Sequence, residues 1–160
     1  IKEKPLLAVA KAHRAEGRVE AALEKARQHA ALNPHDGDAR GFYAALLLQS
    51  GAASAAVDVL HAVARSADPP PAYASLYARA LCAVGEAGAA RRWHERASAA
   101  APEDVAIAAA RVMDGLWLEH DPAGTRRRAF RFQDRRRSLH SLAARRGPAT
   151  VRRVNSDSLR

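Results

Sequence analysis

The chain has 160 residues, a formal net charge of +9 and 48% apolar residues. Forty residues are Ala, and only 30 are Leu, Ile, Val or Phe, so any core has to be thin and closely packed. No apolar run approaches the ~20 residues that a membrane-spanning helix needs, and the single Cys82 excludes an intrachain disulfide. Because the chain begins at Ile1 rather than at Met, we expect a piece of a longer or processed protein. We expect it to be soluble, in the cytoplasm or the periplasm.

The charge is distributed unevenly. Residues 1–120 carry 14 Lys and Arg against 14 Asp and Glu, whereas residues 121–160 carry 12 Arg against three Asp. Such asymmetry predicts that the C-terminal part meets a polyanion or an acidic partner, or that it is a solvated end. Arg outnumbers Lys 22 to 4, which together with the excess of Ala is typical of a G+C-rich genome.

The first predicted unit is a helical hairpin over residues 4–36. Its first helix covers residues 6–15 and is followed by Gly17, which can adopt the positive φ common just past a helix end. The spacing of the alanines and Leu23 predicts a second helix over residues 19–32. Pro34 ends this helix because proline has no amide donor.

The same pattern returns after 34 residues. Three glycines and three alanines stand in register at this interval: Gly17, Gly51 and Gly85, and Ala22, Ala56 and Ala90. Pro34 and Pro102 lie two intervals apart, and residues 68–71 break the helix in the middle copy. The spacing predicts two further hairpins, over residues 37–70 and 71–104, with a helix over 72–84. Because one such hairpin cannot bury its apolar face, we expect stacking into an all-α superhelix with a concave face.

Residues 105–146 predict a fourth, degenerate hairpin. Its first helix covers residues 105–119, and Pro122 ends it. A second helix is predicted over 123–146 from a stripe of Ala129, Phe132, Leu139, Leu142 and Ala143. The repeat domain then extends over residues 1–146, and residues 147–160 are predicted to form a basic, flexible tail.

With these glycine, alanine and proline positions the chain resembles the tetratricopeptide repeat family over residues 4–104. The resemblance implies an α–α solenoid without a cofactor that binds a protein segment in the groove lined by its first helices. The function implied is that of an interaction scaffold or adaptor within a larger bacterial protein or assembly. Carried over by register, the groove residues are Lys4, Leu7, Lys11, Arg14, Leu48, Gln49, Ser75, Arg79 and Cys82. The places where some members clamp a terminal carboxylate retain only Lys11 as a basic residue, so we do not expect that binding mode.

The strongest local charge signal is a set of seven arginines on the last predicted helix: Arg126, Arg127, Arg128, Arg131, Arg135, Arg136 and Arg137. With Phe130 and Phe132 among them, they could form a footprint for nucleic acid, anionic lipid or acidic polysaccharide. They could also be the polar outer face of a capping helix, which repeat arrays need for solubility. We favour the capping helix, because no nucleic-acid-binding motif accompanies the charge.

Two further sets of residues bear on function. Met113, Leu116 and Trp117 could be a hot spot for a partner or part of the core, and the small number of large side chains favours the core. The seven histidines show no metal-binding spacing, and no catalytic motif is present. We therefore expect no metal site and no enzyme activity, and the oligomeric state is left open.

Overall fold

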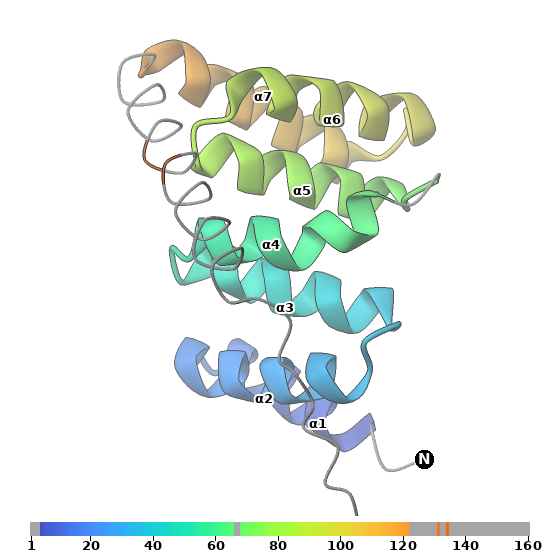
Figure 1. Ribbon diagram of the computed structural model, residues 1–160, viewed down its shortest axis with the longest axis vertical. Helices are drawn as coiled ribbons and strands as arrows, with labels where there is room; N and C mark the ends of the chain where they lie inside the picture. Colours follow the sequence, from blue (N-terminus) through green and yellow to red (C-terminus); the bar gives the residue numbers. More distant parts are fainter. Residues whose placement is uncertain (1–3, 66–67, 122–130, 132–133, 135–160) are drawn as a thin grey trace, which may run out of the picture.

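Seven helices make up the structure, a computed structural model that describes residues 4–65, 68–121, 131 and 134. They are α1 (Lys4–Ala15), α2 (Val19–Leu32), α3 (Gly37–Gln49), α4 (Ala53–Ala64), α5 (Pro71–Ala83), α6 (Ala87–Ala100) and α7 (Val105–His120). The helices stack along the longest axis of the molecule, with α1 and α2 at one end and α6 and α7 at the other (Figure 1). The described ranges contain no strand, which confirms the predicted all-α fold. No helix within them combines the length and apolar character needed to cross a bilayer.

Three identical turns close the hairpins. Gly17, Gly51 and Gly85 have φ of 75°, 80° and 89°, and no other described residue has a positive φ. In the first turn the Gly17 amide donates to the Arg14 carbonyl at 3.1 Å, and the next amide donates to the His13 carbonyl at 2.9 Å. The same two bonds recur at Gly51 and Gly85, so α1, α3 and α5 end in the same hydrogen-bonded turn. The predicted glycine register therefore corresponds to a repeated backbone conformation.

Helix starts follow the same repeat. The Asp36 carboxylate accepts the Ala39 amide at 3.2 Å, and 68 residues later Asp104 accepts the Ala106 and Ile107 amides at 2.9 and 3.1 Å. These side chains satisfy amides that the first turn of a helix leaves unpaired. The copy between them, over residues 71–104, begins instead with Pro71 at the first position of α5, where no amide is needed.

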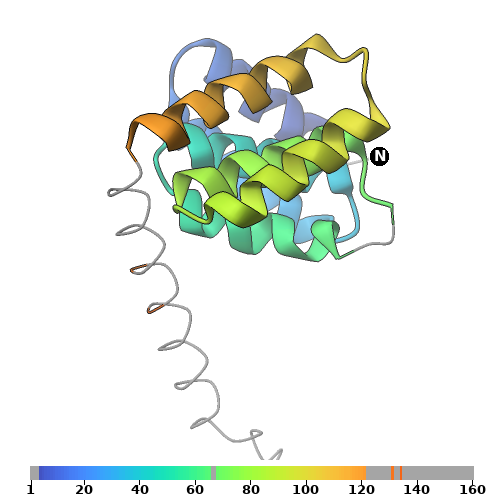
Figure 2. The ribbon, with the colours of Figure 1, turned by 90° about the horizontal axis from the view of Figure 1, so that it is seen from above.

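Small side chains let the helices approach one another closely. Each helix packs on the next, and among the first helices of the hairpins α3 packs on α5 and α5 on α7. Alanines fill the contacts between helices, and Ala10, Ala22, Ala56 and Ala90 are fully buried. Seen down the stack, α6 and α7 lie side by side at the near end (Figure 2).

The last described helix departs from the repeat. Glu119 stands 34 residues after Gly85, and α7 runs on to His120 rather than ending two residues before this place, as α1, α3 and α5 do. The placement of Met113, Leu116 and Trp117 in the core was wrong, since they are 66%, 49% and 38% exposed. The reason is that α7 buries only Ile107 and Leu118 against the preceding helices, and no following helix belongs to the described residues.

The rest of the predicted fourth hairpin lies outside the described residues. This applies to the helix expected over 123–146 and to the tail expected over 147–160, except for Arg131 and Asp134. Those two residues are helical and exposed.

Candidate functional site

The first helices of three hairpins enclose a pocket of about 390 Å³, here called the groove pocket. It is lined by Leu48 of α3, by Arg79, Cys82 and Ala83 of α5, and by Met113, Asp114 and Trp117 of α7. Three predicted groove residues, Leu48, Arg79 and Cys82, therefore come together in one place. The three residues from α7 were not among the predicted groove residues.

Hydrogen bonds hold the wall of the groove pocket in place. The buried Cys82 thiol donates to the Asp114 carbonyl at 3.8 Å, which joins α5 to α7. The Asp114 carboxylate lies 3.0 Å from Nε2 of His94, a residue of α6 that is 3% exposed. The carboxylate of the pocket is thus already engaged by a side chain of the protein.

A cation and an apolar wall remain at the surface of the groove pocket. Arg79 is exposed, and it forms no ion pair within the part of the chain that the structure describes. Beside it lie the exposed side chains of Met113 and Trp117, residue types that are enriched in protein interfaces. This arrangement suits a partner segment in which an acidic residue stands next to a residue with an apolar side chain.

A second pocket, of about 540 Å³, lies near the other end of the stack. Leu7 and Lys11, two more predicted groove residues, line it together with Ala8, His29, Asn33, Asp36 and Asp38. The two pockets divide the predicted groove into an α1 part and an α5–α7 part.

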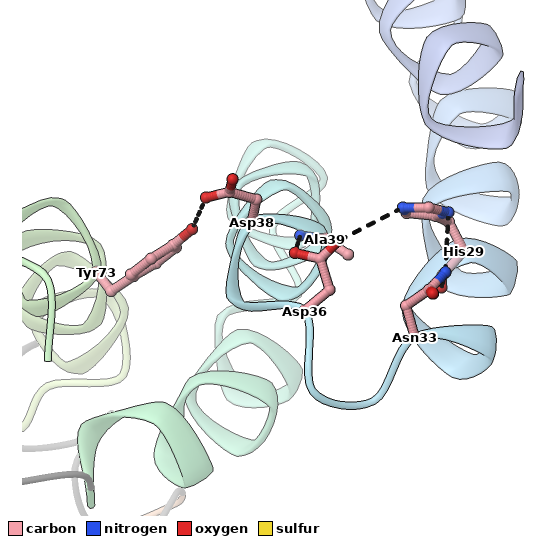
Figure 3. Close-up of polar contacts among 6 residues, drawn as sticks. All are labelled: His29, Asn33, Asp36, Asp38, Ala39 and Tyr73. Atoms are coloured by element: carbon pink, nitrogen blue, oxygen red, sulfur yellow. Dashed lines mark hydrogen bonds and ion pairs between the residues drawn. The ribbon is translucent and has the colours of Figure 1, made fainter. Parts of the chain in front are cut away.

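The polar groups of this second pocket are engaged with each other. Nε2 of His29 lies 3.9 Å from the Asp36 carboxylate, and the Asn33 amide donates to the His29 carbonyl at 3.1 Å (Figure 3). Tyr73 of α5 donates its hydroxyl to Asp38 (Figure 3). Burial and, secondarily, Asp38 raise the pKa of Tyr73 well above its usual value. This network therefore connects α2 to α3 and α3 to α5, and its role is structural.

The other predicted site residues are scattered. Arg14 lies 5.8 Å from the centroid of the Phe42 ring, and Gln49 is exposed at the end of α3. Ser75 is 6% exposed, so its hydroxyl is not accessible from the groove. Lys4 belongs to α1, but its side chain is outside the described part, as are the seven arginines apart from the exposed Arg131. Among the described residues no group of three or more His, Cys, Asp or Glu side chains could hold a metal ion.

Comparison with known proteins agrees with the repeat geometry. Residues 13–80, from the end of α1 into α5, match the family model described as tetratricopeptide repeat. Together with the seven stacked helices and their three identical turns, this match makes the chain a tetratricopeptide-type repeat protein. Repeats of this type generally mediate protein–protein interaction and are typically not catalytic. Neither the search of curated proteins nor that of solved structures gave a match.

Proposed function

We propose that the chain is an interaction scaffold, part of a larger bacterial protein or assembly, that binds a partner segment along the groove of its first helices. The observation that carries this proposal is the groove pocket, in which α3, α5 and α7 present an apolar wall and an exposed cation together. Its volume of about 390 Å³ lies at the lower end of the range for small-ligand sites, which suits one bulky side chain. No catalytic role is proposed, since an interaction surface is what this repeat type normally supplies.

The partner class follows from the chemistry of the groove pocket. Trp117, Met113 and Leu48 favour a large apolar residue such as Phe or Leu, because its burial removes apolar surface from water on both sides. Arg79 favours an Asp or Glu next to that residue. Lys11 and Arg14, both exposed on α1, add positive charge further along the groove. We infer that the ligand is an acidic segment with one bulky apolar anchor.

The chain contains two tryptophans, which makes a direct binding assay available. Trp93 packs edge-on against Tyr77 with ring centroids 5.2 Å apart, away from the groove pocket. In a full-length Trp93→Phe variant, Trp117 is therefore the sole tryptophan and reports on the groove pocket. Titration with a Glu-Phe-Glu-centred peptide should shift its emission in a saturable way, and the Lys-Phe-Lys and Glu-Ala-Glu versions should bind at least about tenfold more weakly.

Binding should also respond to substitutions in the groove pocket. With a labelled peptide, Arg79→Glu should slow association, and Met113→Ala should speed dissociation. The matched control for the charge change is Arg92→Glu, at an exposed arginine of α6. The matched control for the apolar change is Leu116→Ala, which removes exposed apolar surface outside the groove pocket. Equal effects of the control and groove variants would contradict the proposal.

The second candidate function is polyanion binding through the C-terminal arginines. The salt dependence of the binding affinity distinguishes it from peptide binding in the groove. Affinity for duplex DNA should fall on a log–log plot against salt with a slope of about 0.9 for each phosphate neutralised. Changing Arg127, Arg131 and Arg135 together to Glu should abolish such binding while leaving the peptide titration intact. Tight DNA binding that disappears with this triple change, in a chain that binds no acidic peptide, would overturn the proposed function.

A further inference from the structure

A second surface, independent of the groove, lies at the α7 end of the stack and is here called the end face. It forms a pocket of about 580 Å³ between α6 and α7. Ser98 of α6 and Pro102 of the loop that follows supply one side. Its α7 side consists of Ala108, Arg111, Val112, Gly115, Leu116 and Glu119.

The equivalent face of the preceding repeat unit, on α5, is buried. The residues that stand 34 positions before the six α7 residues are Ala74, Tyr77, Ala78, Leu81, Cys82 and Gly85. All six are buried, because the next two helices, α6 and α7, pack on α5. Tyr77 meets Trp93 of α6, and Cys82 meets the Asp114 backbone of α7. The end face is therefore the equivalent of the α5 surface that the two following helices cover.

The chemistry of the end face still suits a covering helix. Val112 and Leu116 are 59% and 49% exposed and lie one turn apart at its centre. Ala108 and Gly115 are small, and a Cβ built on Gly115 meets no atom within 4 Å, so a helix backbone has room to approach. Arg111 and Glu119 replace the buried Tyr77 and Gly85 of the preceding unit, which makes the two edges charged.

We propose that the end face is the docking site for residues 123–146 of this same chain. The segment starts directly beyond the place where α7 ends, and Pro122, which cannot continue a helix, stands between them in the sequence. At 1.5 Å per residue, a helix of about 11 residues spans the distance from Glu119 back to Ala108, and the segment offers more than twice that length. Its stripe of Ala129, Phe132, Leu139, Leu142 and Ala143 supplies the apolar face required.

The charges match in the antiparallel direction. Arg126 to Arg128 follow the turn and would meet Glu119 and the negative C-terminal end of α7. Asp134 comes seven residues after Arg127, and Arg111 lies eight residues before Glu119. A returning helix therefore brings an acidic residue toward the basic edge and a basic cluster toward the acidic edge. Both pairs lie at the rim, where side chains keep much of their exposure.

Hydrogen exchange of the full-length chain tests this docking. The amides of residues 123–146 should be protected, and Leu116→Asp should lower that protection at least about tenfold, because a charge enters an apolar contact. Phe132→Asp, on the other side of the contact, should have the same effect, and adding it to Leu116→Asp should cause little further loss. Met113→Asp, at another exposed apolar site on α7 that faces the groove pocket, is the matched control and should leave the protection unchanged.

Three outcomes would overturn the proposal. The first is exchange of residues 123–146 at the rate of an unfolded peptide in the unaltered chain. The second is protection that Leu116→Asp and Met113→Asp reduce equally. The third is protection that disappears on dilution together with a dimer in sedimentation, because the end face would then bind a second copy of the chain. Peptide binding in the groove pocket does not enter any of these readouts.

Discussion

In α3, Gly41 is buried beneath the ring of Tyr73 from α5, and we expect Gly41→Ala to destabilise the fold although alanine favours helices. A Cβ placed on Gly41 would stand 2.9 Å from Cδ1 and 3.1 Å from Cζ of Tyr73, and closer still to Cε1. The ring would have to move, and its hydroxyl would leave Asp38. The methyl group therefore costs packing between two hairpins.

The magnitude follows from two opposing contributions. Replacing glycine by alanine inside a helix stabilises by about 0.5–1 kcal/mol, whereas overpacking a buried contact costs about 1–3 kcal/mol. The difference gives an expected net loss for Gly41→Ala of about 1 kcal/mol, with an upper limit of about 2.5 kcal/mol. Gly88 in α6 is the matched control, because the nearest atom to its added Cβ is the flexible Nη1 of Arg92 at 3.8 Å. Gly88→Ala should stabilise by the helix contribution alone.

Urea unfolding followed by circular dichroism measures both changes through the midpoint at constant m. In a Tyr73→Ala background the obstacle is gone, and Gly41→Ala should become neutral or stabilising. If Gly41→Ala raises the midpoint as Gly88→Ala does, or if its effect is the same with and without the Tyr73 ring, the packing argument is refuted.

Three further predictions concern a turn, a buried pair and a tyrosine. Gly51→Ala should cost about 1–2 kcal/mol in urea unfolding because φ is 80° there, and Gly51→Asn should cost less, since asparagine tolerates this conformation. Asp114→Ala should cost about 1–3 kcal/mol by leaving His94 buried without its partner, and a loss no larger than that of an exposed Asp58→Ala control would contradict this. Because the raised pKa of Tyr73 favours the protonated hydroxyl in the fold, its contribution is complete below pH 10 and is lost as the pH rises further. Unfolding midpoints above pH 10 should therefore fall more steeply for the unaltered chain than for Tyr73→Phe, and parallel curves would show that Tyr73 is not involved.

The turns were predictable because they depend on local chemistry. Glycine at positive φ and proline without an amide act within a few residues, and the helices expected over 19–32 and 72–84 lie at Val19–Leu32 and Pro71–Ala83. The end of α7 was predicted at residue 119 and lies at His120, because Pro122 cannot continue a helix.

Which side of a helix is covered could not be predicted in the same way. The apolar residues of α7 lie all round the helix, so the periodicity did not show that Leu118 is buried while Leu116 and Trp117 are exposed. Ser75 and Arg79 share a face of α5, but only the long arginine side chain reaches solvent. In both cases the outcome depends on neighbouring helices.

The pair of His94 and Asp114 was missed because these residues are 20 positions apart in the sequence. The sequence did contain one signal, since Asp114 interrupts the otherwise apolar stretch at the centre of α7. A charged residue in such a position requires a partner, and His94 of the preceding helix is that partner.

The unequal contacts along the stack also determine how the protein responds to mechanical load. The hairpin of α1 and α2 is held mainly through α3, over a small cluster of Ala10, Ala22, Ala26 and Leu46, whereas α5 packs against α3, α4, α6 and α7. In a linear array each unit is stabilised only by its neighbours, so a force applied at the N-terminus would detach the α1–α2 hairpin first. A partner seated between α5 and α7 would stay bound while this hairpin extends. The N-terminal hairpin would therefore yield at a lower force than the part of the stack that holds the partner.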